Sequence, residues 1–182
     1  MVTSSASAIA RLLSDFGFSH VVGVPDNTSA SLFSALTEVT PGIRDLFATR
    51  EGEAISLAAG LWLGGARPAV VIQNTGLLEA GDGLRGTAAR MGVPLLLLIT
   101  CRGYAKARAG GMEPDSVPVD RDILVRADLD SVAHMTEKTL RAWGIPFHFL
   151  QDPADLTPIS EAWEQAQNEG RPVAVLVDTP LT

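Results

Sequence analysis

The sequence contains few residues of two kinds, cysteine and the cationic residues. Cys101 is the only cysteine, which excludes an internal disulfide and any zinc or iron–sulfur site built from several cysteines. A cytoplasmic location is therefore expected. The 14 Lys and Arg residues leave a net charge of -7, which argues against a nucleic-acid or anionic membrane surface because both need clustered cations. A few suitably positioned arginines are enough to bind a small anion, so the composition does not exclude an anionic substrate.

Long apolar runs and low-complexity segments are also missing. The run Leu-Leu-Leu-Leu-Ile at 95–99 is far too short to span a bilayer, so no membrane association is expected. Residues 1–7 lack the basic region and apolar run of a secretory signal. The 182 residues are 46% hydrophobic and 19% charged, a composition typical of folded proteins. One globular domain over residues 1–182 is expected.

Apolar β-branched runs alternate with helical patterns along the chain, which predicts an α/β fold. The expected architecture is a three-layer open parallel sheet of about six strands with helices on both faces. Predicted strands cover residues 20–24, 43–48, 68–72, 95–100, 147–150 and 173–177. Predicted helices cover residues 7–16, 29–38, 52–63, 77–91, 131–143 and 159–168.

The alternation stops between residues 101 and 130. Glycines and prolines stand there among scattered charges, at Gly103, Gly110, Gly111, Pro114 and Pro118. We predict a long loop, which a compact domain keeps for function or leaves mobile.

Two motifs lie where an open parallel sheet binds its ligands, beyond the carboxyl ends of the strands. Glu51 opens an apolar helix and is followed nine residues later by Gly60, with small residues between. The strand at 68–72 runs into Gln73-Asn74-Thr75-Gly76. Their order and spacing resemble the pyrimidine-binding domain of thiamine-diphosphate enzymes, and among these the separate alpha subunits of phosphonopyruvate and sulfopyruvate decarboxylases. The resemblance covers residues 7–100 well and the remainder loosely.

The resemblance implies a catalytic role for Glu51. In that family the matching glutamate hydrogen-bonds N1′ of the aminopyrimidine ring and acts as an acid–base relay that activates the cofactor. Without the resemblance, an acidic residue in the first turn would simply complement the helix dipole. Glu53 has the wrong spacing to Gly60. It is expected to be a second acid that complements the helix dipole, or a plain surface residue.

The turn after the third strand is expected to contribute Gln73 and Asn74 to the cofactor and the substrate. It resembles the Gln-Asn-Ser-Gly turn of the decarboxylases, with Thr75 in place of Ser. The alternative is a plain strand-to-helix turn in which Asn74 or Thr75 caps the next helix. The following residues, Leu77-Leu78-Glu79, depart from the Leu-Gly-Asn of that family.

Three further positions follow from the resemblance. Pro25 is expected to contact the cofactor. Asn27 occupies the position two residues after Pro that varies with the reaction, and it is expected to face the substrate; the alternative is a generic strand end capped by turn residues. Arg102-Gly103 resembles the Arg-Gly that follows the central strand in the alpha subunits. Arg102 could therefore meet an anionic substrate tail, together with Lys106 or Arg108, whereas loop cations of this kind are usually solvated.

Some residues are assigned no chemistry. Gly81-Asp82-Gly83 imitates the start of the family's magnesium–diphosphate motif, but the Asn that completes the motif is missing between Asn74 and Asn168, so no metal ligand is assigned. His20, His134 and His148 have neither metal-ligand spacing nor a nearby nucleophile, and structural roles are expected.

The resemblance implies the alpha subunit of a two-subunit thiamine-diphosphate-dependent 2-keto acid decarboxylase. A diphosphate-binding beta subunit would supply the Mg²⁺ ligands, in a hetero-oligomer with at least two alpha and two beta chains. The alternatives are a subunit of a split thiamine-diphosphate carboligase and a non-catalytic binding subunit of the same fold. A nucleotide-binding doubly wound domain ranks last because no Gly-x-Gly-x-x-Gly follows the first strand.

Overall fold

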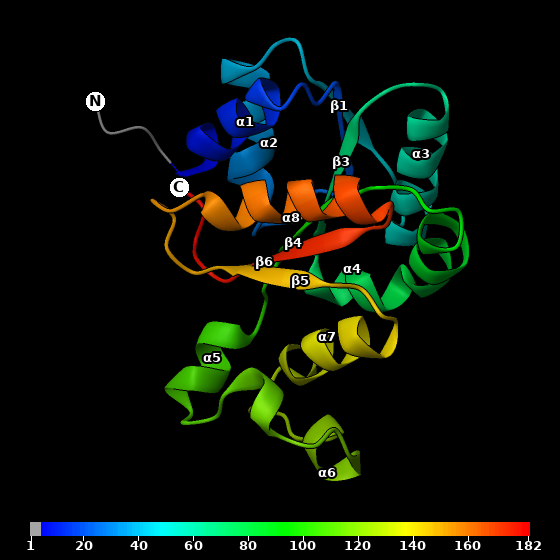
Figure 1. Cartoon of the computed structure of the whole chain (residues 1–182). Coiled ribbons are helices and arrows are strands. Elements are labelled where there is room, and N and C mark those ends of the chain that lie inside the picture. Colours follow the sequence, from blue (N-terminus) through cyan, green and yellow to red (C-terminus); the bar gives the residue numbers. More distant parts are fainter. Residues whose placement is uncertain (1–4) are drawn as a thin grey trace.

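A computed structural model describes residues 5–182 and has an all-parallel, six-stranded sheet at its centre (Figure 1). The strand order is β2-β1-β3-β4-β6-β5. The strands are β1 (His20–Gly23), β2 (Arg44–Phe47), β3 (Pro68–Gln73), β4 (Leu96–Thr100), β5 (Phe147–Leu150) and β6 (Val173–Val177). The predicted α/β fold is confirmed. Residues 1–4, the first part of the stretch without a secretory signal pattern, lie outside the described residues.

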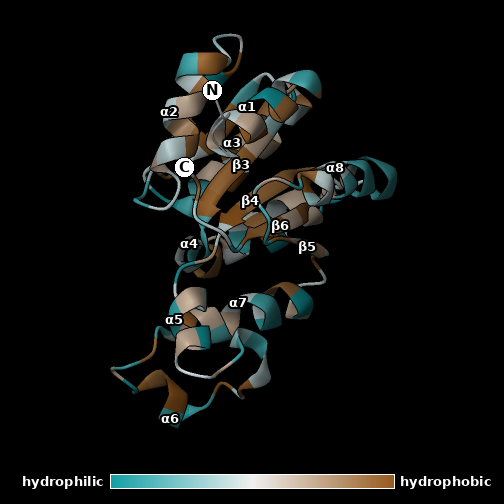
Figure 2. Ribbon diagram, turned by 90° about the vertical axis from the view of Figure 1, so that its left-hand side faces the viewer, coloured by the Kyte–Doolittle hydropathy of each residue, from teal (hydrophilic) through white to brown (hydrophobic). Residues whose placement is uncertain are grey.

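Helices cover both faces of the sheet. One face packs against α1 (Ser5–Asp15), α2 (Ala30–Val39) and α8 (Thr157–Glu169); the other packs against α3 (Glu51–Leu63), α4 (Asn74–Glu79), the π-helix η1 (Gly83–Ala89) and α7 (Ser131–Ala142). Within β4, Leu96 and Leu98 face the first core, whereas Leu97 and Ile99 face the second. Figure 2 shows the resulting concentration of apolar residues on the central strands.

The topology of the sheet defines one crevice at its carboxyl edge. β1 pairs with β2 on one side and with β3 on the other, so successive connections leave β1 in opposite directions. Ligands of open α/β sheets bind at such a switch point. The segments after β1 and β3, which carry Asn27 and Gln73, therefore flank the expected crevice.

The single helix predicted over residues 77–91 is wrong in its extent. α4 begins three residues earlier, at Asn74, and the chain then forms the π-helix η1. Gly83 lies against the first turn of α3, where an added Cβ would be 2.7 Å from the Gly52 carbonyl oxygen. This close backbone approach accompanies the change of helix type, which sequence periodicity does not reveal.

The segment predicted as a long loop includes three short helical elements. It contains α5 (Tyr104–Ala109), the 3₁₀-helix η2 (Pro114–Ser116) and α6 (Arg121–Leu124), and Figure 1 shows it extending away from the sheet below α7. α6 starts with a side-chain cap, since Asp120 Oδ1 accepts a hydrogen bond from the Ile123 N–H at 3.0 Å.

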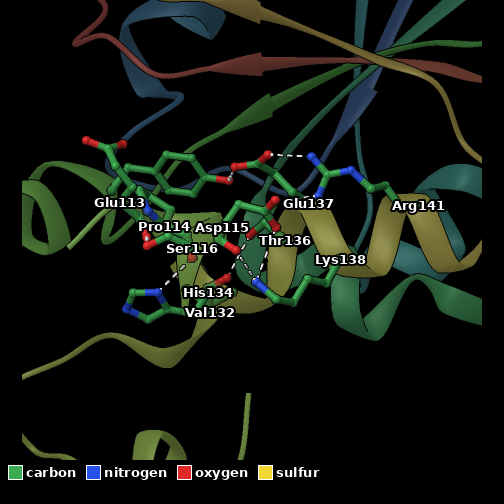
Figure 3. Close-up of polar contacts among 11 residues, drawn as sticks. Glu113, Pro114, Asp115, Ser116, Val132, His134, Thr136, Glu137, Lys138 and Arg141 are labelled. Carbon is green, nitrogen blue, oxygen red and sulfur yellow. Dashed lines mark hydrogen bonds and ion pairs between the residues drawn. The ribbon is translucent and has the colours of Figure 1, made fainter. Parts of the chain in front are cut away.

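Contacts with α7 hold η2 in place (Figure 3). His134 Nδ1 donates to the Pro114 carbonyl at 2.8 Å, and Lys138 Nζ donates to the Asp115 carbonyl at 2.7 Å. Arg141 Nη1 lies 2.7 Å from Asp115 Oδ2. These partners lie 20 to 26 residues away in sequence, so local patterns in the segment give no sign of them.

Gly23→Ala should destabilise the protein. The added Cβ would lie 2.1 Å from the Val71 carbonyl oxygen and 2.9 Å from Phe33 Cζ, and a strand backbone cannot move aside easily. We expect a loss of about 1–3 kcal/mol in urea unfolding, the usual cost of overpacking. The control is Gly60→Ala in α3, where nothing lies within 4 Å and a gain of about 0.5–1 kcal/mol is expected. Equal effects of the two substitutions would contradict the close packing of β1 on β3.

Candidate functional site

Glu51 stands at the first position of α3, beside the turn that follows β3. Its side chain packs directly on Gly76, because a Cβ added there would lie 2.2 Å from Glu51 Cγ and Oε1. Gly52, the next residue of α3, lies against the end of α4, because a Cβ added there would be 3.4 Å from Glu79 Oε2. Two glycines therefore allow the first turn of α3 to lie against α4, and the structure brings together the two motifs that carried the resemblance.

The neighbouring carboxylates are engaged within the chain. Glu53 accepts hydrogen bonds from the Thr49 N–H at 3.1 Å and from Thr49 Oγ1 at 3.0 Å, and the backbone bond is the main cause that lowers the pKa of Glu53. Glu79 accepts from the Gly52 N–H at 2.7 Å and from Arg50 Nε at 2.8 Å. The Gly52 bond is the main cause that lowers the pKa of Glu79.

The Glu51 carboxylate differs from both neighbours. Among residues 5–182 it has no hydrogen-bond or ion-pair partner, although its side chain is half-buried. Of Glu51, Glu53 and Glu79, Glu51 is therefore the one whose carboxylate oxygens are available to accept a hydrogen bond from a ligand.

A polar network crosses the crevice between the ends of β1, β3 and β4. Gln73 Nε2 donates to Asp26 Oδ1 at 3.1 Å and lies 3.3 Å from Thr28 Oγ1. The Thr28 and Thr100 hydroxyls lie 2.6 Å apart. Sequence reasoning placed residues 25–28 among the candidate positions at the strand ends but assigned no role to Asp26, Thr28 or Thr100. The Asp-x-Thr pattern after Pro25 is a turn signal that could have indicated the first two, whereas Thr100 is recognisable only once the strand order is known.

An open cavity of about 300 Å³ adjoins this network. Asn27, Thr28, Thr100, Cys101, Ala105 and residues 177–181 line it. Pro25 and Asn27 are exposed at its side of the sheet, and Glu51 is not among the lining residues. Burial, followed by the nearby charge of Asp178, raises the pKa of the Cys101 thiol, which therefore stays neutral.

Asn74 lies at the start of α4. It is fully buried, and its amide is hydrogen-bonded to the Arg102 backbone and to Thr136. It does not cap α4, and neither does Thr75, whose hydroxyl lies 3.1 Å from Gln73 Oε1. The alternative, in which Asn74 or Thr75 caps the helix after β3, is therefore wrong.

Arg102 and Arg108, two of the loop cations, are paired in the structure. Arg102 is exposed and its Nε lies 2.8 Å from Asp130 Oδ2, while Arg108 Nη1 lies 2.6 Å from Asp178 Oδ2. Lys106 is exposed on α5. An anionic tail would share or compete with Asp130 for the Arg102 guanidinium, of which Nε is engaged.

A buried carboxylate on α7 supports the segment after β4 (Figure 3). Tyr104 Oη lies 3.5 Å from Glu137 Oε1, and Arg141 Nη2 lies 3.1 Å from Glu137 Oε2. Burial raises the pKa of Glu137, and the charge of Asp115 adds to the effect. This cluster belongs to the scaffold, since it ties α5 and η2 to α7.

The histidines make contacts within the chain. His20 Nδ1 lies 2.9 Å from Ser19 Oγ, His148 Nε2 lies 2.9 Å from Gln165 Oε1, and His134 bonds the carbonyl of Pro114. Over residues 5–182, no three His, Cys, Asp or Glu side chains group as metal ligands would. Within the same range, no helix has both the length and the apolarity to cross a membrane.

Comparison with known families decides the membership of the chain. The family described as thiamine pyrophosphate enzyme, N-terminal TPP binding domain, matches residues 3–120. The chain belongs to this family. The matched range includes Glu51, the turn after β3 and the end of β4, where the candidate site lies.

Two relatives align with the chain along nearly their whole length. The sulfopyruvate decarboxylase subunit alpha of Methanococcus maripaludis is 25% identical over 176 residues, covering 96% of this chain and 95% of the relative. That of Methanothermobacter thermautotrophicus is 26% identical over 179 residues, covering 98% of each. The phosphonopyruvate decarboxylase of Streptomyces viridochromogenes is 34% identical over 91 residues, covering 50% of this chain and 23% of the relative.

Gly76→Ala should be destabilising through Glu51. The new methyl group would overlap the glutamate side chain, so we expect a cost of about 1–3 kcal/mol in urea unfolding. In a Glu51→Ala background the overlap is absent and the cost of Gly76→Ala should largely disappear. Additive effects in this double-mutant cycle would contradict the direct packing of Glu51 on Gly76.

Proposed function

We propose that the chain is the alpha subunit of a two-subunit thiamine-diphosphate-dependent decarboxylase of a 2-keto acid, with Glu51 as its catalytic acid–base group. The observation that carries the proposal is the Glu51 carboxylate, half-buried against Gly76 and without a partner among residues 5–182. Membership in the thiamine pyrophosphate family supports the cofactor. The two alpha-subunit relatives, aligned over nearly the full chain, support the subunit organisation and the reaction.

The residues present fit an aminopyrimidine ring. A ring nitrogen that gains a proton needs a carboxylate acceptor, and Glu51 offers one while Glu53 and Glu79 are already bound. Thiamine diphosphate, when bound, supplies a nucleophilic carbon and an electron sink for the loss of carbon dioxide. In the proposal Glu51 orients the ring by a hydrogen bond and exchanges one proton with it, and Pro25 and Gln73 contact the cofactor from the other side of the crevice.

The substrate groups follow from the same edge of the sheet. Asn27 and Gln73 are proposed to face the keto acid, with the cavity next to Asn27 open to its remaining chain. Arg102 is proposed to meet an anionic tail by leaving Asp130, since an ion pair at the surface is weak and exchanges readily.

The partner is proposed to be a diphosphate-binding beta subunit. It would hold the diphosphate and supply the ligands for Mg²⁺, so that each catalytic centre forms between an alpha and a beta chain. A cytoplasmic hetero-oligomer with at least two alpha and two beta chains completes the proposal.

The isolated chain should bind thiamine diphosphate weakly and should not decarboxylate 2-keto acids. The reason is that most of the cofactor's charge would be held by the partner. Calorimetric titration of the chain with thiamine diphosphate and Mg²⁺, with and without the beta subunit, measures this. Tight binding and turnover by the chain alone would overturn the split site.

Glu51→Gln in the assembled enzyme should lower kcat by roughly two to four orders of magnitude, the range for loss of a general acid–base group. Folding and assembly should be retained because the amide has nearly the same shape. Glu53→Gln is the matched control, two residues along the same helix, and should leave turnover within a few-fold of the parent. A similar loss in both variants, or normal turnover in Glu51→Gln, would remove Glu51 from the proton relay.

A further inference from the structure

The Asn74 side chain makes a two-sided contact with the backbone of one residue in the loop after β4. Its Oδ1 accepts a hydrogen bond from the Arg102 N–H at 3.0 Å, and its Nδ2 donates to the Arg102 carbonyl at 2.9 Å. The amide thus pairs with the Arg102 backbone as a neighbouring strand would. Asn74 is fully buried, so water does not compete for these bonds.

Thr136 of α7 completes this contact. Its Oγ1 donates to the Val132 carbonyl at 2.7 Å and lies 3.1 Å from Asn74 Nδ2, from which it accepts. Asn74 Nδ2 has two N–H groups, and both now have acceptors. Thr136 is also fully buried. Its hydroxyl therefore supports the amide direction that the two Arg102 bonds require, by accepting from the second N–H of Asn74 Nδ2.

The same loop is bound to α7 at two further points. Arg102 pairs with Asp130, which immediately precedes α7. Gly103 has φ +87°, and an added Cβ would lie 2.9 Å from Asp130 Cβ and 3.2 Å from Ala133 Cβ. The loop between β4 and α5 is therefore held between α4 and α7, directly after Thr100 and Cys101, which line the cavity.

We propose that Thr136 is a positioning residue: it orients Asn74, which clamps the Arg102 backbone and thereby fixes the wall of the substrate cavity formed by Thr100 and Cys101. Asn74 then belongs to the site as a clamp and makes no contact with substrate. The clamp itself can be measured without turnover. Only its expected effect on substrate kinetics rests on the proposed function.

Amide hydrogen exchange at Arg102 tests the clamp in the full chain. Thr136→Val keeps the shape of the side chain and removes the hydroxyl, so exchange of the Arg102 N–H should accelerate roughly tenfold or more as the local contact loosens. Thr136→Ser keeps the hydroxyl and should restore protection. Thr139→Val is the matched control, because Thr139 lies on the same helix and its hydroxyl has no hydrogen bond among residues 5–182.

A double-mutant cycle tests whether Thr136 acts through Asn74. If it does, Thr136→Val should add no further acceleration at Arg102 in an Asn74→Ala background. Should Thr136→Val fail to fold, Asn74→Asp tests the same contact from the other side, because a carboxylate cannot donate to Thr136 or to the Arg102 carbonyl. Unchanged protection of Arg102, or additive effects in the cycle, would overturn the clamp.

Kinetics of the assembled enzyme test its consequence. Thr136→Val should raise KM for the 2-keto acid several-fold with a smaller change in kcat, and Thr136→Ser should reverse this. A parent enzyme without decarboxylase activity would refute the proposed function and leave the exchange result standing. Faster exchange at Arg102 with an unchanged KM in an active enzyme would refute the role of the clamp in substrate binding.

Discussion

The burial of both faces of the sheet is the constraint on which the rest of the structure depends. β4 and β6 are buried at every position, so a polar side chain within them would need its own buried partner. In these two strands polar side chains are therefore confined to the strand end. Thr100, the last residue of β4, illustrates this, because its hydroxyl meets Thr28 beyond the end of β1. The polar edge of the sheet is thus a product of the same packing that stabilises the core.

The first turn of α3 occupies this edge through small residues. Gly76 leaves room for the Glu51 side chain, and Gly83 lets the π-helix reach the Gly52 backbone. Larger residues at these places would move the helix outward and carry Glu51 with it. The pairing of Glu79 with Arg50 and Gly52 then anchors the turn, so Glu51 is held by backbone packing while its carboxylate stays unpaired among residues 5–182.

The sheet could be predicted closely from the sequence, because buried parallel strands give continuous apolar runs between turn residues. Each predicted strand agrees with the structure to within one residue at either end. Glu51 and Gln73 could likewise be named from their places at a helix start and a strand end. Two features could not be predicted: the ordered helical structure of the segment after β4, and the direction of the Asn74 amide. The first depends on Asp115 meeting α7, and the second on Thr136, 62 residues further along the chain. Pairings over such sequence distances leave no local pattern.

The π-helix has a mechanical consequence for this region of the chain. Its wider turn holds one more residue than an α-helical turn would, and yet Leu84 and Ala88 are both fully buried. If the segment stayed a π-helix, removing one residue from 83–89 would rotate the residues after it about the helix axis by somewhat less than the roughly 100° that one α-helical residue turns. Either the contact of Gly83 with α3 or the burial of Ala88 would then be lost. The number of residues in this short segment therefore sets the angle, about the helix axis, between the side that contacts α3 and the side whose apolar residues enter the core.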